Sequence, residues 1–265
     1  MVNTPEELGA WLRLSLTPGV GNESARKLLA AFGPPDRIFA QTESALRQVV
    51  SAAQARHLMG TPDGWTDLSQ DTWAWLQHSP DPAIAHAVVT LGDADYPAPL
   101  LGMPDPPLML YGMGSPACDL NTLAQHTIAM VGSRNATPQG EANAEQFATA
   151  LAGQGYAIVS GLARGIDTAA HEGAVAAKGR TIAVIGSGLG RLYPPENEAL
   201  AARIADGHGA VVSEFPILTE PDKQTFPQRN RIVSGWSSGI LVVEAPAWSG
   251  ALITANNAAD QGRSV

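Results

Sequence analysis

Three strand-length runs decide the fold, and each ends in a turn of small residues: TIAMVGSR at 127–134, YAIVSGLARG at 156–165 and TIAVIGSG at 181–188. The runs are apolar throughout, and helix-length segments at 137–152 and 167–177 separate them. Strands that are apolar on both faces and alternate with helices are typical of a parallel sheet covered on both sides. This stretch therefore predicts an α/β fold.

The same alternation continues toward the C-terminus. We expect a helix at 196–205, a strand at 210–213, a short helix at 228–234, a strand at 240–244 and a helix from Gly250. The prediction is a doubly wound, mostly parallel sheet of extended Rossmann-like type. Because position 265 is where a further strand would begin, we expect this domain, residues 85–265, to be truncated at its C-terminal end.

The segment before the sheet has helical spacing. Thr4, Pro5 and Glu7 form the start of a helix, with a capping box and a proline at the first helical position. Asn22 is placed to cap a second helix, and more short helices are expected to about residue 78. Residues 1–84 are therefore predicted to form a small helical domain. Short strands are expected near 87–91 and 108–111.

The break between the first two helices, PGVG at 18–21, allows two interpretations. It is similar to a helix-hairpin-helix element, whose hairpin glycines present backbone N–H groups to a phosphate without reading base sequence. It is equally consistent with a plain connector, because only Arg26 and Lys27 lie nearby and the surrounding segment is acidic. The sequence leaves both open.

Small residues and arginines gather where the predicted parallel strands end. In such a sheet the ligand crevice lies beyond the carboxyl ends, where helix N-termini and backbone N–H groups attract anions. Glycine allows close approach to the backbone, serine adds a hydroxyl donor and arginine clamps phosphate. We expect these residues to meet in one anion-binding cleft: Gly132, Ser133, Arg134, Ser160, Gly161, Arg164, Gly186, Gly188, Arg229, Asn230, Arg231, Ser249 and Gly250. The plainer interpretation is that the glycines serve only tight strand-to-helix turns.

The distribution of charge permits such a cleft on an acidic protein. The formal net charge is −9, which argues against a nucleic-acid partner because phosphate contacts require local positive charge. Residues 1–125, however, carry 6 basic and 13 acidic side chains, whereas residues 126–235 carry 9 and 10. The second segment is nearly neutral, so a local basic groove remains possible there.

Two other kinds of site are suggested by the motifs. The run GSGLG at 186–190 is only superficially similar to a dinucleotide fingerprint, because Arg191 stands where its third glycine belongs, so no cofactor is expected. Asp167 and His171 are four residues apart and share a helix face, as a hydrolytic pair would. The favoured interpretation is that Asp167 caps its helix and His171 packs locally. Glu244, which ends a strand, is expected to hold an arginine or a backbone group.

Composition narrows the class of protein. The apolar runs are strand-length and far shorter than the ~20 residues that span a bilayer, so no membrane partner is expected. The N-terminus lacks the basic and apolar pattern of a secretory signal, which favours a cytoplasmic protein. Cys118 is the single cysteine and is interpreted as structurally incidental, and no clustered ligands indicate a metal site.

Taken together, the motifs resemble the DprA (Smf) family of DNA-processing proteins. The resemblance is carried by VGSR at 131–134, SGLARGID at 160–167, YP at 193–194, FP at 226–227 with RNRI at 229–232, VVEA at 242–245 and SG at 249–250. It implies an extended Rossmann-like core behind a helical, sterile-alpha-motif-like N-terminal domain. It also implies a non-enzymatic protein that binds single-stranded DNA and loads RecA recombinase in natural transformation, recombination or repair.

Further expectations follow from the resemblance. The phosphate-binding motifs would include Gly165, and the full-length protein would form a homodimer. Family members often carry a basic residue after the Tyr-Pro pair, whereas this chain has Pro195 and Glu196, so Arg191 is expected to replace that contact. A winged-helix-like module often follows in the family and is expected to be absent here. The alternative hypothesis is a nucleotide-processing phosphoribohydrolase on a related Rossmann fold, although its Pro-Gly-Gly-x-Gly-Thr signature does not occur.

Overall fold

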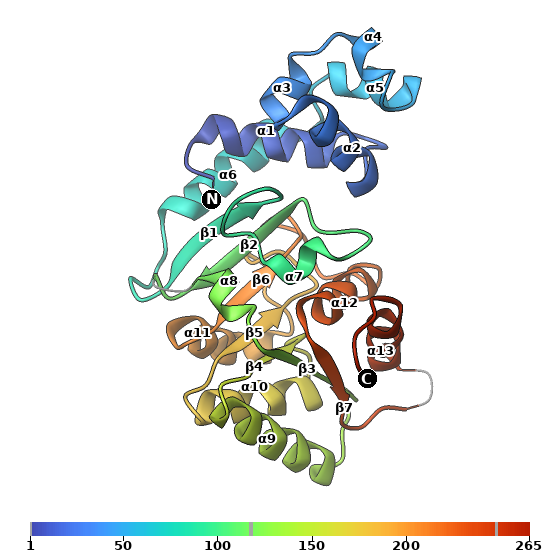
Figure 1. Cartoon of the computed structure of the whole chain (residues 1–265). Helices are drawn as coiled ribbons and strands as arrows, with labels where there is room; N and C mark the ends of the chain where they lie inside the picture. The colour runs from blue at the N-terminus through green and yellow to red at the C-terminus, as the bar shows by residue number, and fades with distance from the viewer. Residues whose placement is uncertain (1, 117–118, 247–248) are drawn as a thin grey trace.

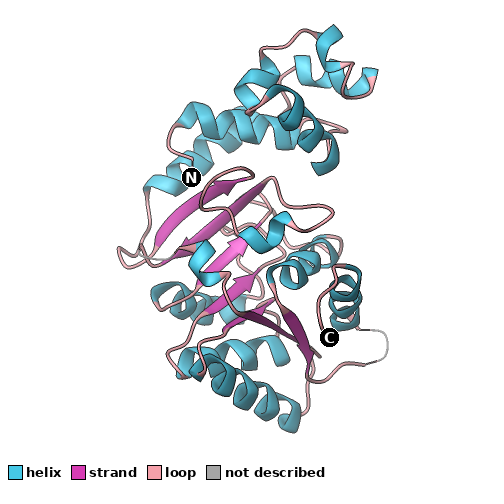
Figure 2. Cartoon of the chain, in the orientation of Figure 1, coloured by secondary structure: helices cyan, strands magenta, loops and turns pink. Residues whose placement is uncertain are grey.

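A single seven-stranded sheet forms the centre of the chain in the computed structural model, which describes residues 2–116, 119–246 and 249–265 (Figures 1 and 2). Cys118 lies outside the described residues. The strand order is β1-β2-β6-β5-β4-β3-β7. The strands are β1 Ala85–Thr90, β2 Met109–Gly114, β3 Thr127–Val131, β4 Ala157–Ser160, β5 Thr181–Val184, β6 Ala210–Ser213 and β7 Gly239–Val242.

Five of these strands form a parallel sheet, which confirms the predicted α/β class. Strands β6, β5, β4, β3 and β7 pair in parallel, whereas β1 pairs with β2, and β2 with β6, in antiparallel register. The chain runs outward from β3 to β6 and then returns to place β7 on the other side of β3. The strand order therefore reverses between β3 and β7. A ligand crevice is expected at the carboxyl ends of the strands where the order reverses.

Helices cover both faces of the sheet because alternate residues of each strand face opposite ways. Met130 and Ile158 pack against α9 (Pro138–Gly153) and α10 (Ile166–Ala176). Val131 and Val159 face the other way and belong to the apolar cluster of α12 (Thr225–Trp236) and α13 (Gly250–Asp260). Helix α11 (Glu198–Asp206) completes the first face through Ala183 and Val211.

Most boundaries agree with the sequence prediction to within a few residues. Thr137 caps α9 by accepting a hydrogen bond from the Gly140 N–H at 3.0 Å, as a threonine before Pro138 predicts. The helix expected from residue 196 begins at Glu198, because one 3-10 turn at Pro195–Asn197 precedes it. The helix expected at 228–234 is longer at both ends, since it packs in the apolar cluster through Trp236.

Six helices precede the sheet within the described residues. They are α1 Pro5–Leu16, α2 Asn22–Phe32, α3 Pro35–Phe39, α4 Glu43–Leu46, α5 Ala52–Met59 and α6 Trp65–Gln77. Thr4 caps α1 through the Glu7 N–H, as predicted. Asn22 is not a cap: it is the first residue of α2, and Gly21 is the N-cap. The sterile-alpha-motif-like character of this region and its boundary at residue 84 stay predictions.

The six helices and the sheet share one apolar core. Leu8 and Leu12 of α1 belong to the same buried cluster as Val88 of β1 and Tyr111 of β2. Two short helices, α7 (Ala98–Leu101) and α8 (Leu120–Leu123), flank β2 in the chain. No helix among the described residues is long and apolar enough to cross a membrane.

Candidate functional site

The main candidate site is a cavity of about 400 Å³ at the carboxyl ends of β3 and β4, which we call the strand-end cavity. It lies where the topology predicts a ligand crevice. Its walls come from the turns after β3 and β4, from α12 and from the start of α13. The lining residues are Val131, Gly132, Ser133, Arg134, Asn135, Gly161, Ala163, Asp167, Arg229, Asn230, Val233, Pro246, Ser249, Gly250, Ala251 and Thr254.

The turn after β3 leaves Arg134 as its outward-facing donor. Gly132 has no side chain because a Cβ there would lie 2.7 Å from the Glu244 carbonyl oxygen. The Ser133 N–H donates to that same carbonyl at 2.6 Å, and the Ser133 Oγ accepts from the Asn135 N–H at 3.1 Å. Arg134 is exposed, and its guanidinium carbon lies 5.1 Å from the centre of the Phe226 ring. The Ser133 N–H and Oγ are thus already hydrogen-bonded, and the exposed Arg134 guanidinium is the positive charge that this turn presents.

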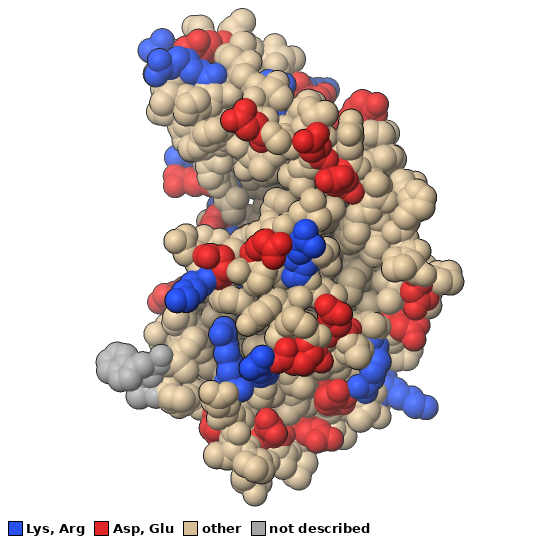
Figure 3. All heavy atoms as spheres, turned by 180° about the vertical axis from the view of Figure 1, so that it is seen from behind, with Lys and Arg blue, Asp and Glu red and all other residues tan. Residues whose placement is uncertain are grey.

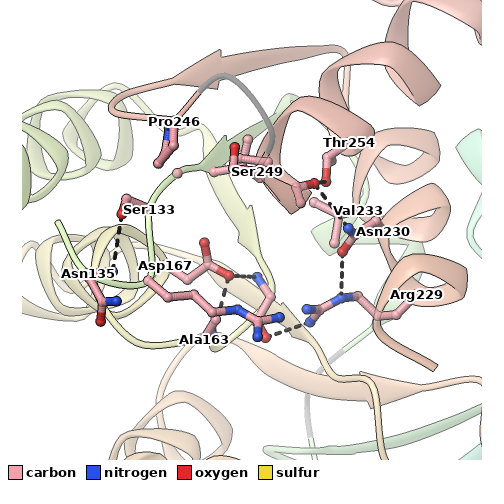
Figure 4. Close-up of a pocket in the computed structure, with 16 residues that line it drawn as sticks. Ser133, Asn135, Ala163, Asp167, Arg229, Asn230, Val233, Pro246, Ser249 and Thr254 are labelled. Atoms are coloured by element: carbon pink, nitrogen blue, oxygen red, sulfur yellow. Dashed lines mark hydrogen bonds between the residues drawn. The ribbon is translucent and has the colours of Figure 1, made fainter. Parts of the chain in front are cut away.

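A buried carboxylate and a buried guanidinium form the floor of the cavity. Figure 4 shows Asp167 between Ser133 and Asn135 on one side and Arg229 and Asn230 on the other. The Asp167 Oδ2 accepts hydrogen bonds from the N–H groups of Gly161 and Ala163, at 3.0 and 3.3 Å. The Gly161 N–H is therefore already used by Asp167 and is not an open donor for a ligand.

The Arg229 guanidinium donates hydrogen bonds to the backbone, and the residue also lines the cavity. It is 4% exposed, and its Nη1 donates to the carbonyl oxygens of Gly161, at 2.5 Å, and Val184. Gly161 must be a glycine because a Cβ there would lie 2.5 Å from that nitrogen. Burial lowers the pKa of Arg229 to about 10, an effect that the charge of Asp167 opposes. Burial likewise raises the pKa of Asp167, and Arg229 opposes it. Arg229 is thus charged at neutral pH.

The start of α13 supplies the other positive side of the cavity. Ser249 is the N-cap, and its side chain makes no capping bond to the helix. Its Oγ is buried and has no hydrogen-bond partner among the described residues. The Asn230 Nδ2 donates to the Gly250 carbonyl oxygen at 3.3 Å and joins α12 to this helix. A helix N-terminus carries partial positive charge and free N–H groups, so this wall suits an anion.

The arrangement places its anion-binding groups at the rim and a carboxylate at the floor. Arg134 and the first turn of α13 attract negative charge, whereas at the floor Asp167 already occupies the Gly161 and Ala163 N–H groups. A phosphate is therefore expected near Arg134 and Ser249 rather than at the bottom of the cavity. Among the described residues, no group of three or more His, Cys, Asp or Glu is placed to hold a metal ion.

Eight of the predicted site residues come together in this cavity, and seven do not. Those that line it are Gly132, Ser133, Arg134, Gly161, Arg229, Asn230, Ser249 and Gly250. Those that lie outside it are Ser160, Arg164, Gly165, Gly186, Gly188, Arg191 and Arg231. The expectation of one cleft shared by all the arginines is therefore wrong.

The arginines outside the cavity are bound to carboxylates. Arg164 pairs with Glu196, and the Arg191 Nε lies 2.9 Å from the Glu220 Oε1. Arg231 pairs with Glu214 and lies 3.5 Å from Asp105, in a second cavity of about 390 Å³ that Ser15 and Gly21 of the helical region also line. Arg231 faces away from Arg229 because residues two apart on a helix lie on different sides.

The small residues outside the cavity support the turns. Ser160 donates its hydroxyl to the Met130 carbonyl oxygen at 2.6 Å. Gly165 has a φ of +71°, and a Cβ there would lie 2.3 Å from the Ser133 carbonyl oxygen. At Gly186 a Cβ would meet Phe226 at 2.8 Å, and at Gly188 it would meet the Pro216 carbonyl oxygen at 2.2 Å. For these four the plainer interpretation of tight turns describes the geometry.

His171, the second member of the candidate hydrolytic pair, and Glu244 both have structural partners. His171 is fully buried and its Nδ1 lies 2.7 Å from the Thr181 Oγ1, away from the cavity. The Glu244 carboxylate accepts hydrogen bonds from the Thr137 N–H, at 3.0 Å, and from the Thr137 hydroxyl, at 2.7 Å. Glu244 thus holds a backbone group, as expected, and joins β7 to the cap of α9.

His171 predicts a measurable pH dependence of stability. Burial lowers its pKa to about 3, below its usual 6.5. The unfolded chain therefore binds this proton between about pH 6.5 and 3 while the folded chain does not, so stability falls as the pH drops through that window. In the wild type this proton contributes up to about 1.4 kcal/mol per pH unit to the slope of the free energy of unfolding against pH. The His171→Asn variant, which retains an N–H near Thr181, should lack that contribution. Urea unfolding from pH 7 to 5 measures it; equal slopes in both proteins would contradict the prediction.

Some lining residues were not predicted as site residues. Ala163, Val233 and Thr254 carry no chemical signal in the sequence, and Asn135 was overlooked although it follows Arg134 directly. Asp167 was interpreted as a helix cap. Its position seven residues after the end of β4, within a turn rich in N–H groups, is the signal that could have placed it at the cavity.

Basic and acidic side chains are mixed on the surface that can be viewed. On the face shown in Figure 3, Lys and Arg side chains are interspersed with Asp and Glu. The pairs Arg164–Glu196 and Arg191–Glu220 show the same mixing of charge, with all four side chains at least 45% exposed.

Comparisons with known proteins find a matching family model and similar sequences. Residues 87–265 match the family model described as DNA recombination-mediator protein A. The chain is 42% identical over 177 residues to protein Smf of Synechocystis sp., and 42% identical over 178 residues to the DNA processing protein DprA of Bacillus subtilis. These matches cover 67% of this chain in each case, and 44% and 58% of the two relatives. The chain thus spans about half the length of the curated relatives it matches.

Two solved structures extend the likeness to the fold. DprA of Streptococcus pneumoniae superposes on this chain with a TM-score of 0.77 at 30% sequence identity. The match covers 99% of this chain and 86% of the S. pneumoniae chain. DprA of Helicobacter pylori superposes with a TM-score of 0.58 at 29% identity, over 66% of this chain and 78% of its own. The latter structure concerns the single-stranded DNA binding mode of the H. pylori protein.

Proposed function

The chain belongs to the DNA recombination-mediator protein A family, and from this premise we propose that it binds single-stranded DNA through the strand-end cavity without catalysing a reaction. The observation that supports the proposal is the meeting of Arg134 with the open N-terminus of α13 at the rim. Both favour a phosphate, and a phosphate contact carries no sequence information. Binding is thus expected to tolerate any base sequence.

Six of the eight predicted residues that line the cavity are proposed as its DNA contacts: Gly132, Ser133, Arg134, Asn230, Ser249 and Gly250. Gly161 and Arg229 are proposed to act on DNA only by shaping the floor of the cavity, because their donors already bind Asp167 and two backbone carbonyl oxygens. Arg164 and Arg191 are more than 50% exposed and are proposed as outer contacts once their carboxylate partners are displaced. Ser160, Gly165, Gly186, Gly188 and Arg231 are proposed to act on DNA only through the turns and helix that they hold.

Salt dependence tests the DNA-binding proposal. Binding of a 20-nucleotide oligo(dT) should weaken about 15- to 60-fold between about 50 and 200 mM salt if three or four phosphates are neutralised, because the release of counterions becomes less favourable as salt rises. The matched duplex should bind more weakly throughout. Fluorescence anisotropy of labelled DNA measures both. Affinity that does not change with salt, or tighter binding of duplex, would count against the proposal.

A second prediction concerns the carboxylate that occupies Arg164. Glu196 pairs with Arg164, which is proposed above as an outer contact. The Glu196→Gln variant removes one repulsive charge and releases the arginine, so affinity for oligo(dT) should rise about two- to fivefold at low salt. Glu141→Gln, an equal change of charge on α9, is the control and should have a smaller effect. No gain over this control would show that Arg164 does not reach the DNA.

The finer proposal is that the protein delivers single-stranded DNA to the RecA recombinase. The description of the family as recombination mediators supports it. A gel-shift comparison of oligo(dT) with the chain, with RecA and with both tests it, and a slower complex formed only when both are present is the expected result. Formation of the full-length homodimer stays a prediction.

A further inference from the structure

An exposed aromatic ring stands beside the strand-end cavity and has no part in the function described so far. Tyr193 is 41% exposed, although most large apolar side chains of the chain are buried. It lies on the segment between β5 and the 3-10 turn at Pro195–Asn197. An aromatic ring left in solvent next to a ligand cavity is a candidate contact for a flat, apolar group.

The ring is held in place by a second one. The centres of the Tyr193 and Phe226 rings lie 5.8 Å apart, with an angle of 48° between their planes. Phe226 lies in the first turn of α12, and Gly186 gives it room, since any Cβ at Gly186 would meet it at 2.8 Å. The Tyr193 segment is tied down by hydrogen bonds from the Gly188 N–H to the Thr219 carbonyl oxygen and from the Gly190 N–H to the Ile217 carbonyl oxygen.

This aromatic pair is continuous with the proposed phosphate contact. The Arg134 guanidinium lies over the Phe226 ring, and Arg134 lines the cavity. Helix α12, which begins with Phe226 in its first turn, also brings Arg229 and Asn230 to the cavity wall. The proposed phosphate contact, Arg134, thus lies on the same surface as the exposed Tyr193 ring. One nucleotide could then contact Arg134 with its phosphate and Tyr193 with its base.

We propose that Tyr193, supported by Phe226, is a stacking platform for a base of the strand whose phosphate is held at Arg134. The inference rests on the proposed function and adds the contact that selects single strands. Every base has a flat face, so stacking on an aromatic ring tolerates any sequence. In a duplex both faces of each base are covered by neighbouring pairs, so the platform is of use only to an unpaired strand.

The experiment compares DNA with and without bases. Anisotropy is measured with a labelled oligo(dT) and with a backbone of equal length made of tetrahydrofuran abasic residues. Removal of the ring in Tyr193→Ala should weaken oligo(dT) binding about tenfold, within the range for one stacked base, and should change abasic binding less than twofold. Tyr193→Phe should retain wild-type affinity, because the ring alone is needed.

The control variant is Phe147→Ala, which removes an equally exposed ring, 50% accessible, from α9 beside Ile128 and Gly239 at the opposite ends of the strands. It should bind both ligands like the wild type. If wild type binds oligo(dT) but Tyr193→Ala binds it equally well, or is weakened by the same factor on abasic DNA, the platform is refuted while the proposed function stands. If wild type binds neither ligand, the proposed function itself fails.

Discussion

Removal of the Arg134 side chain should abolish most of the affinity for single-stranded DNA. In Arg134→Ala we expect about 10- to 100-fold weaker binding of oligo(dT), which corresponds to the ~1.5–3 kcal/mol of a hydrogen bond to a charged group. Arg134 is exposed, and the Ser133 and Glu244 bonds of its turn involve other atoms, so the fold should persist. Anisotropy titration at about 50 mM salt measures the reduced affinity, and circular dichroism verifies the fold.

The control for this variant is Arg37→Ala, which removes the same charge from an exposed position on α3. It should change the affinity less than twofold. The slope of log affinity against log salt should also become shallower in Arg134→Ala, by about 0.7 for each phosphate that the variant no longer neutralises. Equal affinities of wild type and Arg134→Ala would remove the main support for the strand-end cavity as the DNA site.

Replacement of Arg229 should have the largest effect on stability. Arg229→Met leaves the buried Asp167 carboxylate without its opposing charge, and leaves the Gly161 and Val184 carbonyl oxygens without this donor. The buried carboxylate loses a nearby opposing charge and two buried carbonyl oxygens lose their donor, and these effects together should cost about 3–5 kcal/mol. We expect the free energy of unfolding, measured by urea denaturation, to fall by that amount.

Two further variants separate this effect from the removal of an arginine as such. Arg203→Met breaks the pair with Glu172, whose side chains are 51% and 38% exposed, and should cost less than about 1 kcal/mol. Adding Asp167→Asn to Arg229→Met removes the unpaired charge and should restore about 1–2 kcal/mol. A decrease of less than about 1 kcal/mol in Arg229→Met would show that the floor of the cavity does not depend on this guanidinium.

The fold could be predicted because its signal is local. The apolar runs at β3, β4 and β5 are buried on both faces, and their alternation with helices admits few topologies. The position of the strand-end cavity followed from topology for the same reason, since the turn after β3 carries Arg134 to the carboxyl edge of the sheet. These inferences need no knowledge of which distant side chains meet.

The roles of single arginines could not be predicted in the same way. Arg164 and Glu196 are separated by 32 positions, and nothing in either motif indicates that they pair. Arg229 and Arg231 were grouped because they are close in sequence, yet helical geometry places them on different sides, which the spacing itself could have shown. The engagement of the Gly161 N–H by Asp167 depends on the shape of one turn, which composition does not determine.

Asp167 also determines how deep the proposed binding can reach. It is fixed at the bottom of the cavity by two backbone donors, so a phosphate that descended toward Arg229 would find the Gly161 and Ala163 N–H groups already occupied. Under the proposed function the strand would then be held at the rim alone, so affinity should follow the number of rim groups that a strand contacts and not the depth of the cavity.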